Sequence, residues 1–169
     1  NALDFGDSTN PNQIGSTSAM ASPTRGIMAG GSIPSTPVVA TIDYLTISTT
    51  SNASDFGDLL VAQERVSCCS NAVRGVIGSG APSASNLIQY LTIATLGNAI
   101  DFGDSINSNY GKATMSSRTR GVFGANNGPA STDIEYVQIM TLGNAVDFGD
   151  LLASRRRTSG CSNGHGGLG

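Results

Sequence analysis

The chain has 169 residues, 22 of them glycine, and only 12% are charged. Its formal net charge is -3 and Lys112 is its only lysine, which excludes the broad cationic field that attracts nucleic acid or anionic lipid. No apolar stretch approaches the run of about 18 residues that a membrane-spanning helix needs. We therefore expect a chain rich in strands and turns that neither binds nucleic acid nor inserts into a membrane.

The chain starts within a repeat, because the tetrapeptide Asp-Phe-Gly-Asp that begins at Asp4 recurs at Asp55, Asp101 and Asp147. The copies are spaced by 51, 46 and 46 residues, which predicts a repeat unit of about 46 residues. The first residues contain neither Met nor the regions of a signal peptide, which favours removal of an upstream segment. We divide the chain into one repeat domain, 1–169, with units of approximately 1–54, 55–100, 101–146 and a partial 147–169.

Three strands are expected in each unit, in a fixed order. The first is the small, β-prone segment before an Arg-Gly pair, such as 66–70. The second begins at the Arg-Gly itself, such as Arg74, after a short turn at Asn71. The third strand is an alternating apolar run, seen at 42–47, 88–93 and 134–139. The tetrapeptide is expected after it, in the connection to the next unit.

The third strand has a polar residue near its start. Asp43, Gln89 and Glu135 each lie between an isoleucine and a tyrosine. Because side chains alternate along a strand, the isoleucine and tyrosine share one face and the polar group faces away. This alternation predicts a half-buried strand.

The period decides the predicted architecture. Units of 40 to 50 residues with three or four strands are typical of propeller blades, whereas helical repeats need an apolar period of about 3.6 residues. We therefore predict an all-β repeat protein of three- to four-stranded antiparallel units in a β-propeller-like arrangement. A β-sandwich or a fibrous stack is the alternative.

The units resemble kelch-type repeats, which combine paired glycines, a tyrosine in the next strand and a later aromatic. Here Gly30 and Gly31 form such a pair. The units depart from that pattern because tyrosine and phenylalanine are 12 residues apart and because Phe replaces Trp. The tyrosines are Tyr44, Tyr90 and Tyr136, and the aromatics are Phe56, Phe102 and Phe148.

A closer resemblance, over nearly the whole chain, is to kelch-like repeat virion structural and tail-fibre-like proteins of marine phages, particularly cyanophages. In those proteins, units similar to Asp-Phe-Gly-Asp-Leu, Cys-Ser, Thr-Arg-Gly-Val-Phe and Ile-Asp-Tyr-Val-Thr-Ile recur. The resemblance implies a location in the virion.

The tetrapeptides are interpreted as structural corners. An acid–base pair is made once, in one cleft, so four copies argue against catalysis and we expect no enzyme. Calcium is the alternative, but no Asp-rich loop surrounds the copies, so no cofactor is expected. In a corner, Gly supplies an unusual backbone angle, Asp bonds backbone N–H groups and Phe packs between units. The corner residues are Asp4, Phe5, Asp7, Asp55, Phe56, Asp58, Asp101, Phe102, Asp104, Asp147, Phe148 and Asp150.

An arginine precedes a glycine in every complete unit, at Arg25, Arg74 and Arg120. Each could pair with an aspartate of an adjacent unit and so set the register between units. The alternative is a ring of arginines that binds an anionic ligand. A separate basic run, Arg155–Arg157, is interpreted as solvated protection of a strand edge.

The remaining reactive residues give no catalytic or metal pattern. Cys68, Cys69 and Cys161 are interpreted as small buried strand residues, and no triad forms around Cys161 and His165. Tyr110 is the one aromatic outside the repeat pattern, so it is the possible ligand contact.

The expected function is a non-enzymatic structural or adhesive component of a phage particle. Its variable loops, 10–20, 79–86 and 125–133, would contact a host-surface receptor or partner proteins. The unmatched half unit predicts a homo-oligomer or docking on other virion proteins. The alternative is a secreted or cell-surface matrix protein that assembles into filaments without a virus.

Overall fold

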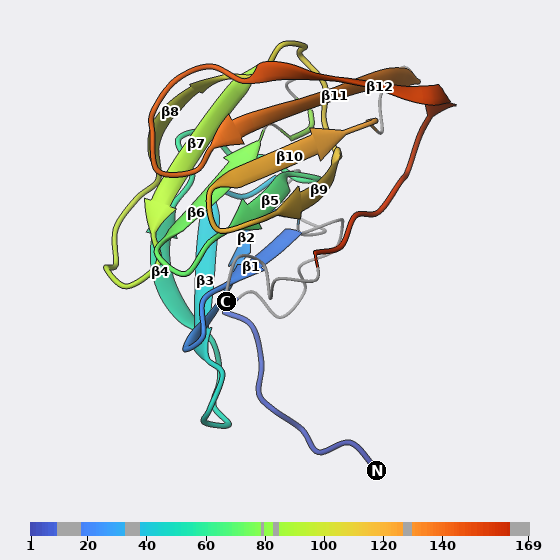
Figure 1. The fold of residues 1–169 in the computed structure, drawn as a ribbon. Coiled ribbons are helices and arrows are strands. Elements are labelled where there is room, and N and C mark those ends of the chain that lie inside the picture. Colours follow the sequence, from blue (N-terminus) through green and yellow to red (C-terminus); the bar gives the residue numbers. More distant parts are fainter. Residues whose placement is uncertain (10–17, 33–37, 79, 83–84, 127–129, 163–169) are drawn as a thin grey trace.

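The structure, a computed structural model, describes residues 1–9, 18–32, 38–78, 80–82, 85–126 and 130–162. In these residues twelve strands form three antiparallel four-stranded sheets, which confirms the all-β class (Figure 1). A search of the described residues finds no helix of the length and apolarity that a membrane span requires.

Each sheet contains one copy of every sequence marker, and its strands are neighbours in chain order. The first sheet consists of β1 (Ser18–Ala21), β2 (Arg25–Ala29), β3 (Thr41–Thr46) and β4 (Ser54–Asp58). The second consists of β5 (Ser67–Ser70), β6 (Arg74–Gly78), β7 (Leu87–Thr92) and β8 (Ile100–Asp104). The third consists of β9 (Ala113–Ser116), β10 (Arg120–Gly124), β11 (Ser131–Gln138) and β12 (Val146–Arg155).

The predicted hairpin before each Arg-Gly is confirmed, and a polar side chain closes its turn. Asn71 Oδ1 accepts the backbone N–H groups of Val73 and Arg74, at 2.9 and 2.8 Å. In the other two sheets a serine oxygen takes this place, since Ser22 and Ser117 each accept the arginine N–H at 3.1 Å. These side chains hold the tight turn that joins the first two strands of each sheet.

The prediction that the tetrapeptide lies in a connection is wrong for three of its four copies, which lie in β4, β8 and β12. In β4 the register with β3 shifts, because Ile42 pairs with Gly57 and Asp43 pairs with Asp55. Phe56 is therefore the extra residue of a β-bulge, and Gly57 has φ +145°. The bulge is local to one strand, so periodicity alone did not separate it from a loop.

The cores lie between neighbouring sheets. One cluster joins Ile27 and Phe56 of the first sheet to Leu91 of the second, and another joins Phe102 of the second sheet to Val137 of the third. The first strands of successive sheets also touch, β1 with β5 and β5 with β9. Each sheet therefore buries its apolar side chains against the next one.

Two of the three cysteines are buried, as predicted, whereas Cys161 is exposed, so the prediction is wrong for that residue. Burial raises the pKa of the Cys68 thiol to about 12 and raises the pKa of Cys69 further. Both side chains are therefore protonated thiols that act as small apolar groups.

Candidate functional site

The tetrapeptide of one sheet meets the Asn-Ala pair of the next sheet in a junction that recurs. The backbone N–H of Asp58 donates to Asn98 Oδ1 at 3.0 Å, and the N–H of Ala99 donates to the carbonyl of Asp58 at 2.8 Å. Asp104 makes the same two bonds to Asn144 and Ala145, at 3.0 and 2.7 Å. The Asn-Ala pair therefore connects consecutive sheets through one side-chain and one backbone hydrogen bond.

The N-terminal tetrapeptide occupies the same kind of junction on the first sheet, although it belongs to no strand. The N–H of Asp7 donates to Asn52 Oδ1 at 3.0 Å, and the N–H of Ala53 donates to the carbonyl of Asp7 at 2.8 Å. Residues 4–7 thus take the place that β4 and β8 take on the sheets that follow them.

The polar residue of each third strand completes the junction. Asp43, Gln89 and Glu135 are only 3%, 0% and 3% exposed, so the predicted half-buried strand is wrong on this face. Each accepts a backbone N–H from the residue two positions after a tetrapeptide. The donors and distances are Thr9 at 3.2 Å, Leu60 at 2.9 Å and Ile106 at 2.8 Å. One side-chain oxygen of each buried polar residue is thus paired with the segment that precedes its own sheet, and the alternation alone did not show this.

The glutamate at this position in the third sheet, Glu135, has two further partners. Glu135 lies 2.5 Å from Lys112 Nζ and accepts a short hydrogen bond from Ser105. Both charged side chains are nearly buried, with 10% of the lysine side chain and 4% of the glutamate side chain exposed. Removing one partner would leave the other buried and unpaired, so the third junction depends on both.

The glycine of the tetrapeptide separates occupied junctions from open ones. A Cβ on Gly6, Gly57 or Gly103 would lie 2.3 to 2.6 Å from backbone atoms of the adjoining loop. A Cβ on Gly149 would meet no atom of the described residues within 4 Å. Three junctions are therefore occupied, and the fourth, on β12, is open.

The phenylalanines follow the same division. Phe56 and Phe102 are 2% and 3% exposed, so the prediction that phenylalanine packs between units is confirmed for both. Phe148 is 54% exposed and Phe5 is 38% exposed, so the prediction of packing between units is wrong for these two copies. We use the name open junction face for the surface of β12 formed by Phe148, Gly149, Asp150 and the fully exposed Leu152.

The Arg-Gly arginines do bridge neighbouring sheets, but not through aspartate. Arg25 Nη1 donates to the carbonyl of Ile93 at 2.8 Å, and Arg74 Nη1 donates to the carbonyl of Ile139 at 3.0 Å. No ion pair of the described residues includes these arginines or Arg120, so the predicted Arg-carboxylate pairs are wrong. Each guanidinium stacks on a tyrosine of its own sheet, Tyr44, Tyr90 or Tyr136, at 4.9, 4.3 and 4.8 Å from the ring centroid.

The glycine of the Arg-Gly pair is required because a sulfur atom from the preceding sheet packs directly against it. A Cβ on Gly75 would lie 2.3 Å from Met20 Sδ, and one on Gly121 would lie 2.5 Å from Cys69 Sγ. The side chain of each first strand therefore packs over the glycine of the next sheet. Sequence reasoning found the Arg-Gly marker but not this contact, which joins residues about 50 positions apart.

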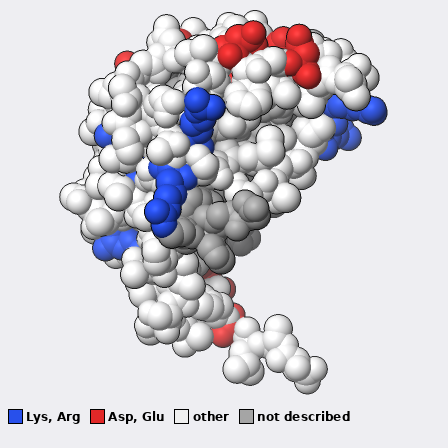
Figure 2. All heavy atoms as spheres, viewed as in Figure 1, with Lys and Arg blue, Asp and Glu red and all other residues white. Residues whose placement is uncertain are grey.

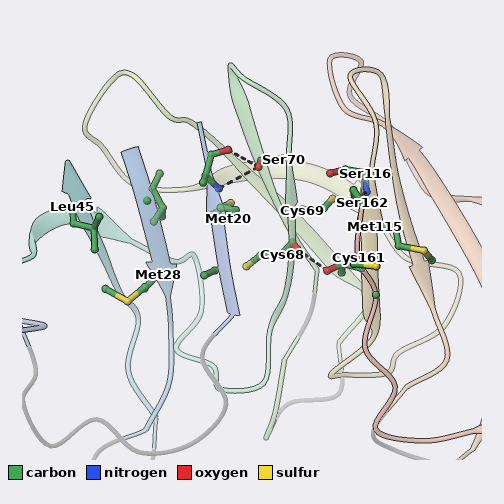
Figure 3. Close-up of a pocket in the computed structure, with 16 residues that line it drawn as sticks. Met20, Met28, Leu45, Cys68, Cys69, Ser70, Met115, Ser116, Cys161 and Ser162 are labelled. Atoms are coloured by element: carbon green, nitrogen blue, oxygen red, sulfur yellow. Dashed lines mark hydrogen bonds between the residues drawn. The ribbon is translucent and has the colours of Figure 1, made fainter. Parts of the chain in front are cut away.

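A sulfur-rich pocket of about 560 Å³ lies along the first strands (Figure 3). Its apolar lining includes Met20, Met28 and Met115, and Cys161 lies on the side of Met115, away from Leu45. The N–H of Ser116 donates to Ser162 Oγ at 2.8 Å, as the N–H of Ala21 donates to Ser70 Oγ at 3.3 Å. Residues 160–162 therefore lie along β9 much as β5 lies along β1.

A second, polar cavity of about 750 Å³ holds the predicted ligand contact, Tyr110, together with Arg65, Lys112 and Arg157. Tyr110 is half-buried, and the Arg65 guanidinium lies 6.0 Å from its ring centroid. The described residues contain no group of three His, Cys, Asp or Glu side chains that could hold a metal. His165 lies outside the described residues.

No protein-family model matches the chain, and no curated protein matches it either. The site rests on its own geometry. Sequence reasoning named the tetrapeptide but missed the Asn-Ala pair and the buried polar residue as its partners. Both recur at the spacing of the tetrapeptide, so their fixed distance from it is a signal that could have identified them.

Proposed function

We propose that this chain is a non-enzymatic structural or adhesive component of a phage particle, such as its tail, a fibre or a surface decoration. In this proposal the three sheets are successive blades of a β-propeller-like array. The contacts of β1 with β5 and of β5 with β9 support that arrangement, because propeller blades place equivalent strands around a common centre.

The observation that carries the proposal is the open junction face. An edge strand of ten residues with an exposed phenylalanine and an exposed leucine is a surface that proteins usually cover. Two sheets of this chain show what covers it, namely an Asn-Ala loop with apolar neighbours. The face therefore suits attachment to a neighbouring copy or to another particle protein.

The virion location rests on the resemblance of the repeated motifs to phage structural proteins. The adhesive role assigns receptor contact to the loops 10–20, 79–86 and 125–133, parts of which lie outside the described residues. The arginines at the end of β12 form a basic group on the surface, apart from the acidic side chains over β11 and β12 (Figure 2). This separation of charge suits protein contacts rather than nucleic acid.

The test is incorporation of the chain into phage particles. Particles are grown with the wild-type chain, with Phe148→Ser, or with Val73→Ser, and the chain is then detected by gold-labelled antibody and by blotting. Val73 is a matched control because it is similarly exposed, at 51%, but belongs to the β5–β6 turn of the second sheet and not to the open junction face. We expect Phe148→Ser to reduce incorporation about tenfold, because it removes an apolar anchor, and Val73→Ser to leave it unchanged.

Absence of the wild-type chain from purified particles would refute the virion location. Isolated filaments in the culture fluid would then support the alternative, a secreted or cell-surface matrix protein. Glycan hydrolysis by the purified chain would contradict the non-enzymatic role.

A further inference from the structure

The polar cavity lies at one end of the first strands, away from the open junction face. The described residues of its lining include three cationic side chains, Arg65, Lys112 and Arg157, and no carboxylate. The chain as a whole has a formal net charge of -3, with 9 basic and 12 acidic residues. The cavity therefore differs from the rest of the molecule in the sign of its charge.

The repeat explains why two arginines meet there. Arg65, Gly111 and Arg157 are 46 residues apart and occupy equivalent positions just before or after a strand. All three have left-handed backbones, with φ of 56°, 63° and 54°. Because equivalent strands of successive sheets touch, equivalent residues converge, and the N–H of Gly111 donates to the carbonyl of Arg65 at 2.9 Å.

The middle one of these three positions has no side chain. Gly111 stands where the other two positions have an arginine. With Gly111 there, all three residues line one cavity of about 750 Å³, within the usual size range of small-molecule sites.

The charges of the three cations are not equally available. The charge of Lys112 is neutralised by Glu135 at 2.5 Å, so Lys112 adds little net positive charge to the cavity. Arg65 uses Nε for Glu64 at 3.3 Å and lies over the ring of Tyr110, which restrains its guanidinium. Arg157 is exposed, and no carboxylate pairs with it in the part of the chain that the structure describes. The cavity lining thus combines an uncompensated guanidinium with a restrained one.

The rest of the lining is rich in hydroxyl groups. Ser18, Thr114, Thr158 and Ser159 contribute side-chain oxygens. Hydroxyl groups both donate and accept hydrogen bonds, so such a lining suits a ligand that itself carries hydroxyl groups.

From these features we infer that the polar cavity binds an acidic saccharide, a sugar chain that carries carboxylate or sulfate groups. The acidic group is held between Arg65 and Arg157, whose planar guanidinium groups suit two-point bonding to an oxyanion. The sugar hydroxyls bond the serine and threonine side chains. This site is separate from the open junction face, so the inference does not depend on assembly through β12.

The experiment measures saccharide binding to the full chain by isothermal titration calorimetry. The probes are tetragalacturonate, a sulfated galactose oligomer, a neutral galactose oligomer and inorganic phosphate. We expect at least one acidic oligomer to bind and the neutral oligomer and phosphate to bind at least about tenfold more weakly. Binding is expected to weaken at high salt, because a partly exposed site is screened.

The variants Arg157→Gln and Arg155→Gln form a matched pair. They remove the same charge from the same basic run, but only Arg157 lines the cavity. We expect Arg157→Gln to weaken binding about tenfold or more and Arg155→Gln to change it less than about twofold. Thermal unfolding of both variants checks that the fold is unchanged.

Three results would overturn the inference. Equal loss in the two variants would show attraction to the basic run as a whole. Equal binding of the neutral oligomer would exclude recognition of the acidic group. Phosphate binding as tight as that of the oligomers would exclude recognition of the sugar. None of these results would bear on incorporation into particles through β12, which is tested separately.

Discussion

The junction after the second sheet and the open junction face after the third contain the same residues in different surroundings. Phe102 is 3% exposed and Phe148 is 54% exposed. Yet both make the same edge-to-face contact with the tyrosine of their own sheet, at centroid distances of 6.1 and 5.9 Å. Contacts within one sheet therefore fix the position of the phenylalanine ring, and the next sheet buries that ring.

This comparison separates local from non-local stabilisation in one molecule. Within a sheet, the hairpins and the Tyr–Phe contact form from residues close in sequence. Burial of the phenylalanine and the glycine requires the next sheet, and burial of the central polar residue requires the segment that precedes its own sheet. In arrays of repeats, stability is a sum of such internal and neighbour contributions, so an end sheet is expected to be the weakest.

The largest effect is expected from truncating the two phenylalanines. Phe102→Ala removes a ring from the core shared with Val137, and we expect it to lower the free energy of unfolding by about 3 to 5 kcal/mol. Phe148→Ala removes mainly the ring contact with Tyr136, and we expect a loss of about 1 kcal/mol. Urea unfolding followed by circular dichroism measures both. Equal losses would show that the third sheet does not present an open copy of the junction.

A second comparison uses the two glycines. Gly103 and Gly149 have similar backbones, with φ of 144° and 134°, so Gly→Ala strains both similarly. Only at Gly103 would the new Cβ also lie 2.6 Å from backbone atoms of Gly143. We expect Gly103→Ala to be more destabilising than Gly149→Ala by about 2 kcal/mol in the same unfolding assay. A difference near zero would mean that the adjoining loop moves away at little cost.

The fold class and the strand order were predictable because strand alternation and turn residues are local signals. Asn71 marks a turn, and the runs around Tyr44 and Tyr90 alternate as strands do. The tetrapeptide was misplaced because a bulge with a positive-φ glycine has the composition of a loop. Its length and spacing could not show that it pairs with the preceding strand.

The candidate site was only partly predictable, because its contacts cross between sheets. The pattern of isoleucine, polar residue and tyrosine gave the two faces of the third strand correctly, but not that the preceding repeat buries the polar face of Gln89. The partner of Arg74 was likewise missed, since a carbonyl acceptor on Ile139 has no side-chain signature. The residues of the site could be identified from the sequence, but their partners became visible only in the arrangement of the sheets.

The smallest effect is expected at the N-terminal segment, residues 4–9. The comparison tests whether this segment stabilises the first sheet as much as a neighbouring sheet would. Asn98→Ala removes the acceptor of the Asp58 N–H between two sheets, and we expect it to cost about 1 kcal/mol. Asn52→Ala removes the equivalent acceptor of Asp7, but this junction holds only residues 4–9, which are mostly exposed. We therefore expect little change in global stability and faster hydrogen exchange at the Asp7 amide, because the segment can detach without unfolding a sheet. A loss in Asn52→Ala equal to that in Asn98→Ala would instead show that residues 4–9 stabilise the first sheet as a full neighbouring sheet does.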